Sequence, residues 1–334
     1  MRARRFLLAP ATAAAVAVTA LALPRGGWDG LPAPVPGPAV VAPARASASH
    51  APATPDRATA TRTATAPPAS APPAHHTDGA PARPPADRGA PPPSAAPSAA
   101  ALPGATRPGT RPPVVSHGPR TGNKVALTFD ADMTDAMLDD LRSGRVRSYA
   151  NLRVVELLER ERIPATFFLT GKWVTRYPEV TRRLAANPLF ELANHTYGHE
   201  AYTAECYGLP TAPTSQLAQD VAATFRILEP YGGRQTRYFR FPGLCYDAAA
   251  LAALAPLGVT VVDGDVVSGD PFATDWRPIV EAVLSAVRPG SIVILHVTEA
   301  NAPMTDEALP HILAGLRQRG LEPAPLSEVL APGA

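Results

Sequence analysis

Residues 124–132 read KVALTFDAD, an apolar and β-branched run that is closed by two carboxylates, Asp130 and Asp132. The run has the length of a buried β-strand. Carboxylates at the end of such a strand indicate a site, because ionised groups are costly to place next to a core. Further apolar runs along the chain also end in polar residues. We therefore expect the strand ends to carry the chemistry.

Apolar runs alternate with helical segments over the second half of the chain. Strands are predicted at residues 124–129, 166–170, 190–194, 238–241, 259–262 and 291–297. Helices are predicted at residues 151–162, 178–186, 213–228, 247–257, 276–287 and 309–319. This alternation predicts an α/β fold with a parallel sheet, either open or closed into a barrel. Functional residues of such folds lie at the carboxyl ends of the strands.

The polar residues that follow these strands form a set that can be tested. They are Asp130, Asp132, His195, His199, Arg240, Asp265, Asp270 and His296. Each alone has an ordinary explanation, such as a helix cap or a turn. Together they place carboxylates, imidazoles and a guanidinium at one edge of one sheet, which indicates binding or catalysis. Asp265 is the exception, because loop hydrogen bonding explains it equally well.

The first third of the chain has a different composition. Of the 41 prolines, 24 lie in residues 24–120, and no Phe, Tyr or Trp occurs in residues 29–128. Without aromatic side chains this segment cannot supply much of a core. We predict a disordered Ala/Pro-rich linker at residues 23–120 and one single-core domain at residues 121–334.

The N-terminus has the pattern of an export signal. A basic start, residues 1–5, precedes an uncharged and mostly apolar run at residues 6–23, and Ala20-Leu21-Ala22 has the small-x-small form of a cleavage site. Residues 1–22 are predicted as a signal peptide, with an uncleaved membrane anchor as the alternative. Both place the domain outside the cytoplasm, as a secreted or cell-surface protein.

Charge argues against a nucleic-acid partner. Residues 1–120 hold 12 Arg and 4 Asp, a balance of +8, whereas the remaining residues hold 19 basic and 25 acidic side chains, a balance of −6. The basic residues are scattered rather than clustered, so they form no phosphate-binding footprint. A membrane is expected as a partner only if the N-terminal segment stays uncleaved, and the sequence leaves the oligomeric state open.

Five short motifs in fixed order resemble those of the polysaccharide deacetylases with a NodB homology domain, carbohydrate esterase family 4. They are Thr128-Phe129-Asp130, His195-Thr196-Tyr197-Gly198-His199, Arg240-Phe241-Pro242-Gly243, residues 265–270, and Ile294-Leu295-His296. The resemblance spans about residues 121–330. It implies a distorted (β/α) barrel, a divalent metal that is usually zinc, and hydrolysis of an N-acetyl group on an amino sugar or of an O-acetyl ester.

The resemblance assigns catalytic roles to four of these residues. Asp130 would be the general base, with Arg240 holding it ionised and oriented. His296 would be the general acid, and Asp270 would favour its protonated form.

The metal and the substrate would take the remaining motif residues. His195, His199 and a carboxylate would hold the metal. Leu295 would form a wall of the pocket for the acetyl methyl group, and the backbone N–H of Gly243 would donate to the oxyanion.

This chain departs from the family pattern at three places. Ala131 stands where the family has its second carboxylate, Gly243 where it has Tyr, and Pro271 where it has Trp. Asp132 comes one residue after Ala131, and we predict that it replaces the missing metal ligand. The alternative is an Asp132 that caps a helix or faces solvent, with the metal held by two histidines and water.

The two cysteines, Cys206 and Cys245, follow the loops of the second and third motifs. In an exported protein this placement favours a disulfide between the two loops. Two buried thiols or extra metal ligands are the alternatives. Trp173 and Trp276 could either stack on sugar rings or pack in the core.

We therefore predict an exported, metal-dependent hydrolase that removes N-acetyl groups from a cell-wall or extracellular polysaccharide, of the peptidoglycan or chitin type. An acetylxylan-type O-deacetylase is the alternative among enzymes. A carbohydrate-binding module of the same fold with weakened catalysis is the alternative outside enzymes, and the displaced carboxylate of the first motif motivates it.

Overall fold

The computed structural model describes residues 101–331, so the predicted export segment and most of the Ala/Pro-rich segment lie outside the described residues. The strands are β1 (Val114–Val115), β2 (Lys124–Ala131), β3 (Ala165–Leu169), β4 (Phe190–Asn194), β5 (Arg234–Phe239), β6 (Thr260–Val262), β7 (Val266–Val267), β8 (Ile292–His296) and β9 (Glu322–Pro323). The α-helices are α1 (Asp135–Arg142), α2 (Leu152–Arg160), α3 (Gly171–Arg176), α4 (Pro178–Ala186), α5 (Leu217–Leu228), α6 (Ala248–Ala253), α7 (Trp276–Ala286), α8 (Thr305–Gln318) and α9 (Leu326–Val329).

The strands form one curled sheet in the order β1-β6-β5-β4-β3-β2-β8-β7, and β9 adds to β2. All paired strands run parallel. Each predicted strand and helix overlaps an observed one, and the distorted α/β barrel class is confirmed. Short elements without a sequence pattern, such as β1, β7 and β9, were not predicted.

Alternation along β2 separates the two faces of the sheet. Leu127 and Phe129 belong to the large core that packs beneath helices, whereas Ala126 belongs to a smaller cluster inside the curl. Because successive side chains of a strand point to opposite faces, Asp130 falls on the inner face with Ala126. The inner face is therefore the one that carries the polar residues.

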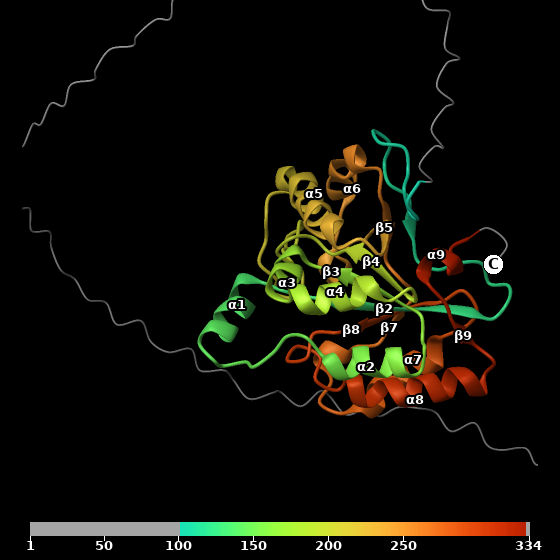
Figure 1. Ribbon diagram of the computed structural model, residues 1–334. Coiled ribbons are helices and arrows are strands. Elements are labelled where there is room, and N and C mark those ends of the chain that lie inside the picture. Colours follow the sequence, from blue (N-terminus) through green and yellow to red (C-terminus); the bar gives the residue numbers. More distant parts are fainter. Residues whose placement is uncertain (1–100, 332–334) are drawn as a thin grey trace, which may run out of the picture. The chain divides into compact units, whose positions relative to one another are not determined.

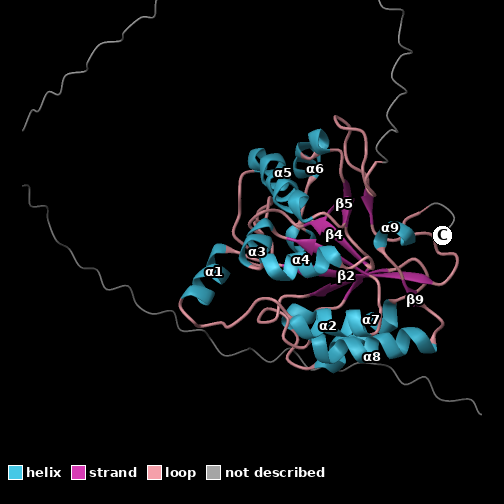
Figure 2. Cartoon of the chain, in the orientation of Figure 1, coloured by secondary structure: helices cyan, strands magenta, loops and turns pink. Residues whose placement is uncertain are grey.

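The helices cover the outer face of the sheet in two groups. Figures 1 and 2 show α2, α7 and α8 together on one side of the strands, and α3, α4, α5 and α6 on the other. The amphipathic pattern of α2 explains its place, because its buried residues are Val154, Val155, Leu157 and Leu158.

The helix α9 fills the inside of the curl at the amino ends of the strands. Leu326 and Val329 of α9 pack with Ala126 and Phe168, and the Leu326 backbone N–H donates to Thr166 Oγ1 at 3.2 Å. With this end filled, the polar inner residues are accessible from the carboxyl ends of the strands, where parallel sheets place their sites.

Residues 101–120 differ from the sequence-based expectation, which placed them in a disordered linker. β1 pairs with β6. The backbone N–H of Thr106 donates to Gly258 at 2.9 Å, and that of Arg237 donates to Pro103 at 2.7 Å. An edge strand needs only backbone pairing, and it tolerates neighbouring prolines, so a segment without aromatic residues can still join a sheet. The domain boundary at residue 120 was wrong for this stretch.

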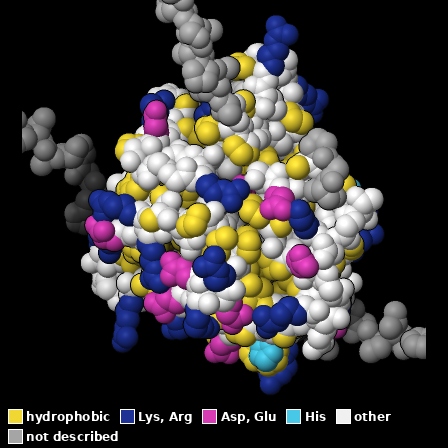
Figure 3. All heavy atoms as spheres, turned by 45° about the vertical axis from the view of Figure 1, so that its right-hand side comes forward, with side chains coloured by type: hydrophobic (Ala, Val, Ile, Leu, Met, Phe, Trp, Pro, Cys, Tyr) yellow, Lys and Arg dark blue, Asp and Glu magenta, His cyan; other side chains and the backbone are white. Residues whose placement is uncertain are grey.

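The described surface carries mixed charge. Acidic and basic side chains lie close to one another on the face shown in Figure 3, and ion pairs such as Arg183 with Glu159 and Arg153 with Asp306 occur on the surface. Within residues 101–331, none of the helices combines the length and the apolarity that crossing a bilayer requires.

Candidate active site

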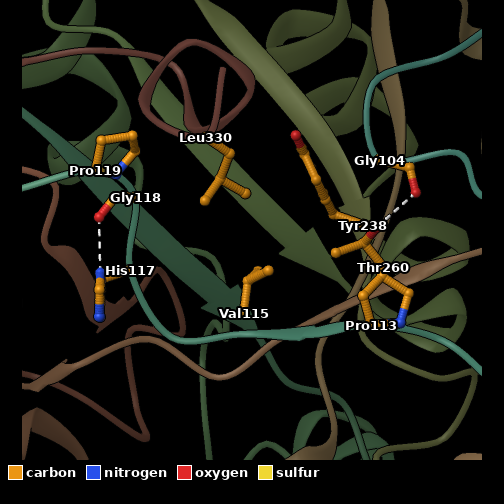
Figure 4. Close-up of a pocket in the computed structure, with 9 residues that line it drawn as sticks. All are labelled: Gly104, Pro113, Val115, His117, Gly118, Pro119, Tyr238, Thr260 and Leu330. Atoms are coloured by element: carbon orange, nitrogen blue, oxygen red, sulfur yellow. Dashed lines mark hydrogen bonds between the residues drawn. The ribbon is translucent and has the colours of Figure 1, made fainter. Parts of the chain in front are cut away.

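A cavity of about 480 Å³ lies at the carboxyl ends of the strands and brings together the predicted residues of five motifs. Its lining includes Asp130, Asp132, His195, His199, Gly243, Asp270 and His296. The sheet register explains the convergence, because Asp130 on β2 is the direct neighbour of His296 on β8. A second cavity of about 520 Å³, drawn in Figure 4, lies between the segment that contains His117 and the residues Tyr238 and Leu330, away from these motifs.

Asp132, His195 and His199 form a cluster with the spacing of a metal site. All three are buried, and one ligand atom of each lies within 4.8 Å of the others. Asp132 Oδ1 is 3.6 Å from His195 Nε2 and 3.2 Å from His199 Nε2. Asp132 Oδ1 is also buried without a hydrogen-bond partner. A buried, unpartnered carboxylate oxygen that faces two imidazole nitrogens fits a cation at their centre.

The imidazole of His195 has the protonation state and the orientation that a metal ligand needs. Its Nδ1 lies 2.9 Å from the Arg240 carbonyl oxygen, so Nδ1–H donates to that oxygen and Nε2 keeps its lone pair for the cluster. Burial lowers the pKa of His195 to about 4, which keeps the ring neutral at physiological pH. A neutral imidazole is the form that binds metal ions.

The loop that carries both histidines is held by its own polar side chains. The Asn194 Oδ1 atom accepts from the Thr196 N–H at 3.0 Å, and Thr196 Oγ1 accepts from the His199 N–H at 3.0 Å. Asp220 Oδ1 accepts from the Tyr197 N–H at 2.7 Å. Thr196 and His199 adopt left-handed φ values of 68° and 58°, which other residues than glycine rarely do. The turn is thus fixed by the network rather than by backbone preference.

Asp132, and not Ala131, faces the histidines. Ala131 is the last residue of β2 and belongs to the outer core. The Asp132 N–H donates to Thr298 Oγ1 at 3.0 Å, and its Oδ2 accepts from Asn301 Nδ2 at 2.9 Å. Burial would raise the pKa of Asp132, but His199 and His296 outweigh it and hold that pKa well below its usual range. The carboxylate is therefore ionised.

Asp130 and Arg240 form a buried ion pair beside this cluster. Arg240 Nη1 donates to Asp130 Oδ1 at 2.6 Å and to Thr128 Oγ1 at 2.9 Å. The guanidinium also lies over the Phe168 ring, 4.0 Å from its centroid. Asp130 Oδ2, which the Arg240 pair leaves free, lies 3.8 Å from His195 Nε2. One oxygen of Asp130 is thus fixed and the other faces the metal cluster.

His296 and Asp270 form a second coupled pair. His296 Nδ1 lies 2.8 Å from Asp270 Oδ1, and the His296 backbone N–H donates to Asp270 Oδ2 at 2.8 Å. Burial would lower the pKa of His296, but Asp270 and Asp132 outweigh burial and raise it to about 10. Burial would likewise raise the pKa of Asp270, yet His296 keeps it below its ordinary value. The imidazolium form therefore predominates, as a general acid requires.

Sequence reasoning missed the hydroxyl groups that support Asp270. Ser268 Oγ donates to Asp270 Oδ1 at 2.7 Å, and Thr305 Oγ1 donates to Asp270 Oδ2 at 2.6 Å. Ser268 could have been found from its position two residues before Asp270. Thr305 and the Asp132 partner Asn301 follow β8 in a stretch without a motif, so only the fold brings them to the site.

Of the two residues predicted to contact the substrate, one lines the cavity and the other does not. Gly243 lines the cavity, as expected. Leu295 does not, and its assignment to the acetyl pocket was wrong: it is completely buried in the outer core, and Ile294 lines the cavity in its place. The strand alternation is the reason, because His296 faces inward, so Leu295 faces outward and Ile294 lies beside the inner residues.

The predicted disulfide is present between Cys206 and Cys245. It connects the loop after His195 and His199 to the loop after Arg240, and these loops follow the neighbouring strands β4 and β5. Asp265, kept apart from the catalytic set, binds Arg120 at 2.7 Å and accepts from the Ile292 N–H at 2.8 Å, which is a structural role.

The two tryptophans that could have contacted sugars pack in the structure. Trp173 is fully buried, and its Nε1–H donates to the Tyr149 carbonyl oxygen at 2.9 Å. Trp276 stacks on His311 with a centroid separation of 4.0 Å. Neither lines the 480 Å³ cavity.

Comparisons with known proteins bear on the family of this chain. The sequence model of the family described as polysaccharide deacetylase matches residues 117–262. A chitooligosaccharide deacetylase of Bradyrhizobium sp. (strain ANU 289) is 32% identical over 193 residues, which cover 53% of this chain and 82% of that relative.

Solved structures of low sequence identity share the fold. A peptidoglycan N-acetylglucosamine deacetylase aligns with a TM-score of 0.54 at 21% identity, covering 65% of this chain and 92% of that chain. A carbohydrate esterase family 4 pseudoenzyme from Bacillus anthracis aligns with a TM-score of 0.53 at 20% identity, covering 66% of this chain and 69% of that chain. By its fold and by its sequence relatives, this chain belongs to the polysaccharide deacetylase family and is a carbohydrate deacetylase of the hydrolase class.

Proposed function

We propose that this protein is an exported, zinc-dependent deacetylase that removes N-acetyl groups from an amino-sugar polymer of the chitin or peptidoglycan type. The observation that carries the proposal is the convergence at one cavity of three units: the cluster of Asp132, His195 and His199, the carboxylate of Asp130 with Arg240 bound to it, and the pair His296–Asp270. Each unit supplies one requirement of amide hydrolysis. The sequence relative named as a chitooligosaccharide deacetylase supports the substrate class.

Asp132, His195 and His199 are the residues that would hold the metal. Two imidazoles and one carboxylate are a ligand set typical of catalytic zinc sites, which leave a position open for water or substrate. When bound, the cation would lower the pKa of a water molecule and polarise the acetyl carbonyl oxygen. The unpartnered Oδ1 of Asp132 supports this assignment, because burial without a partner is otherwise costly.

Asp130 is the proposed general base. Arg240 binds its Oδ1 and so orients the carboxylate, while its Oδ2 is free to accept the proton of the attacking water. The free oxygen lies on the same side as the His195 Nε2 atom, next to the place where that water would be activated. Arg240 is itself fixed by the Thr128 hydroxyl group and the Val262 carbonyl oxygen, so the base cannot rotate away easily.

His296 is the proposed general acid for the departing amine. Because Asp270 occupies Nδ1, the proton that can be delivered is the one on Nε2. An amine leaving group needs this proton, since an amide anion is too basic to leave. Asp270 is held in place by Ser268 and Thr305, so it positions the imidazolium and keeps it charged.

Gly243 is the proposed oxyanion donor through its backbone N–H. It lines the cavity with a left-handed φ of 59°, and the replacement of the family's Tyr by Gly changes the side chain but keeps the donor. Ile294 of β8 takes the place in the cavity wall that the sequence interpretation gave to Leu295.

Export is proposed from the sequence alone. The basic start, the apolar run at residues 6–23 and the small residues at Ala20 and Ala22 favour a signal peptide, and the disulfide agrees with an oxidising compartment. The site of action would then be a polysaccharide outside the cytoplasm.

The proposal is tested by measuring acetate release from N-acetylglucosamine pentamer and from acetylated xylan, after metal removal and zinc reconstitution. We expect release from the pentamer that depends on zinc. Release from xylan alone would show that the substrate is an O-acetyl ester and not an amide. Saccharide binding without any acetate release would indicate a binding module and contradict the proposed activity.

A further inference from the structure

An apolar rim surrounds the mouth of the active-site cavity. Among the described residues, Tyr207 and Phe272 are the most exposed large hydrophobic side chains, each 76% exposed, and both line the cavity. Val267, 59% exposed, lies on the same rim. The described part of the chain has six exposed large hydrophobic side chains, and three of them lie at this one opening. Such clustering marks a binding surface, because single exposed apolar residues scatter over a surface.

The two aromatic rings lie next to each other although they come from different loops. Tyr207 follows β4, and Phe272 belongs to the 3₁₀ turn Asp270–Phe272 that follows β7. Their ring centroids are 6.1 Å apart and their planes are inclined by 42°. At this distance the two rings are neighbours, and because each residue is 76% exposed, most of their surface is open to solvent. They therefore offer a ligand two neighbouring apolar surfaces.

The Tyr207 loop is held in a costly conformation. Tyr207 has a φ of 51° and the preceding Glu205 a φ of 58°, and left-handed backbone is unfavourable for both residue types. The disulfide of Cys206 between them fixes the loop to Cys245. A side chain at Gly243 would place its Cβ 2.6 Å from Cys206 Sγ and 3.0 Å from the Tyr207 ring, so the glycine is what makes room for this arrangement.

Phe272 belongs to the loop that carries Asp270. It lies two residues after Asp270, whose carboxylate is bound by Ser268 and Thr305. Both aromatic rings are therefore attached to loops that also carry catalytic groups. A ligand on these rings would be held at a defined distance from the chemistry.

The chemistry of the rim favours a sugar ring. Tyr207, Phe272, Val267, Leu209 and Leu244 are uncharged, and the ionisable groups of the cavity lie deeper, at Asp130, Asp132 and the histidines. A pyranose ring with equatorial substituents presents C–H groups on its two faces and hydroxyl groups at its edge. Such a face stacks on an exposed aromatic ring, while its edge stays in water.

We propose that Tyr207 and Phe272 form a binding site for the sugar rings next to the acetylated residue, so that the enzyme recognises a chain of several pyranose units rather than a single sugar. This inference rests on the proposed function, because it takes the polymer as the substrate. It assigns specificity for chain length to two side chains that take no part in the chemistry.

The test compares Tyr207→Ala, Phe272→Ala and the double variant with the wild type, all zinc-loaded. The affinity for glucosamine pentamer, a product without acetyl groups, is measured by calorimetry. Each loss of a ring is expected to weaken binding about tenfold, the effect of leaving roughly 50 Å² of apolar surface uncovered. The ratio of kcat/KM for N-acetylglucosamine pentamer to that for the monomer is expected to fall by a similar factor.

Two controls separate ring stacking from general damage. Tyr207→Phe keeps the ring and is expected to keep the affinity. Leu152→Ala removes an exposed apolar side chain of α2, 41% exposed and absent from the cavity lining, and is expected to leave both measurements unchanged. Circular dichroism and a thiol count check that each variant keeps its fold and its disulfide.

The outcomes also separate this inference from the proposed function. Unchanged pentamer affinity in the folded double variant, or a wild type that does not bind the pentamer, overturns the aromatic site. Acetate release that is equally efficient on monomer and pentamer, in wild type and variants alike, overturns the site but leaves the function standing. Ring-dependent pentamer binding without acetate release from any saccharide supports the site and contradicts the function.

Discussion

Asp130 and Asp132 are two residues apart, yet their surroundings give them different roles. Asp130 is bound by the Arg240 guanidinium, and Asp132 faces His195 and His199 with an oxygen that has no hydrogen-bond partner. The alternation of β2 explains why both carboxylates face inward while Ala131 between them belongs to the outer core. The side chain at position 131 thus lies in the core, and Asp132 provides the second carboxylate of the cavity.

Asp130→Asn is expected to abolish most turnover while the metal stays bound. The amide keeps the shape of the side chain but cannot take the proton of water, so kcat should fall by about 10²–10⁴-fold. Zinc affinity should change by less than about threefold, since the three ligands remain. Calorimetric zinc titration beside acetate release checks both effects. A parallel loss of zinc would instead make Asp130 a metal ligand.

Asp270→Asn is expected to shift the alkaline limb of activity to lower pH. His296 must be protonated to act as an acid, so activity falls as the pH rises through its pKa. Asp270 raises that pKa, which is about 10 in the structure, and its neutral replacement removes the main cause. A cation on Asp132 would also lower the pKa of His296, because it would repel the imidazolium. Profiles of kcat/KM against pH measure the limb, and an alkaline limb that stays in place would exclude His296 as the acid.

At the scale of elements, the long periodic segments could be predicted from the sequence. β4 (Phe190–Asn194) and α4 (Pro178–Ala186) begin and end at the predicted residues. Strong periodicity and a proline at the first helical position explain this success. The gathering of polar residues at the strand ends was also predictable, because the parallel sheet brings all carboxyl ends to one edge.

Other elements carry no local signal. α1 (Asp135–Arg142) buries none of its side chains, so it lacks the apolar stripe by which a helix is recognised. The strands β1, β7 and β9 have two residues each, too few to show alternation. Their positions depend on the sheet that they join. For the same reason, Asn301 and Thr305 could not be assigned to the site before the fold was known.

The loops joined by the disulfide are expected to be sensitive to a side chain at Gly243. Gly243→Ala places a Cβ 2.6 Å from Cys206 Sγ at a φ of 59°, whereas Gly144→Ala has a similar φ of 72° and meets nothing within 4 Å. Both variants carry the backbone cost of about 1 kcal/mol, and Gly243→Ala should lose about a further 1–3 kcal/mol from the clash. Urea unfolding measures the difference. Equal losses would show that the loops move apart freely.

We expect the N-terminal residues before and after position 100 to differ in their contribution to the stability of the domain. Deleting residues 29–100 should leave the Tm nearly unchanged, which the composition predicts. Deleting residues 29–118 also removes β1 and the hydrogen bonds at Pro103 and Thr106. If that pairing contributes about 2 kcal/mol, the Tm should fall by about 4–8 °C. Differential scanning calorimetry decides, and equal Tm values for the two deletions would contradict a structural role for residues 101–118.

Asp132, His195 and His199 are proposed to hold the catalytic metal, and zinc titration into the metal-free protein tests this assignment. Wild type should bind one zinc ion, and Asp132→Ala should bind it at least about 10–100-fold more weakly, with acetate release lost at equal zinc. Asn301→Ala, which removes a hydrogen bond to Asp132 but no ligand, serves as the milder reference. Unchanged zinc affinity in Asp132→Ala would show that this carboxylate is not a ligand and that the metal is held in another way.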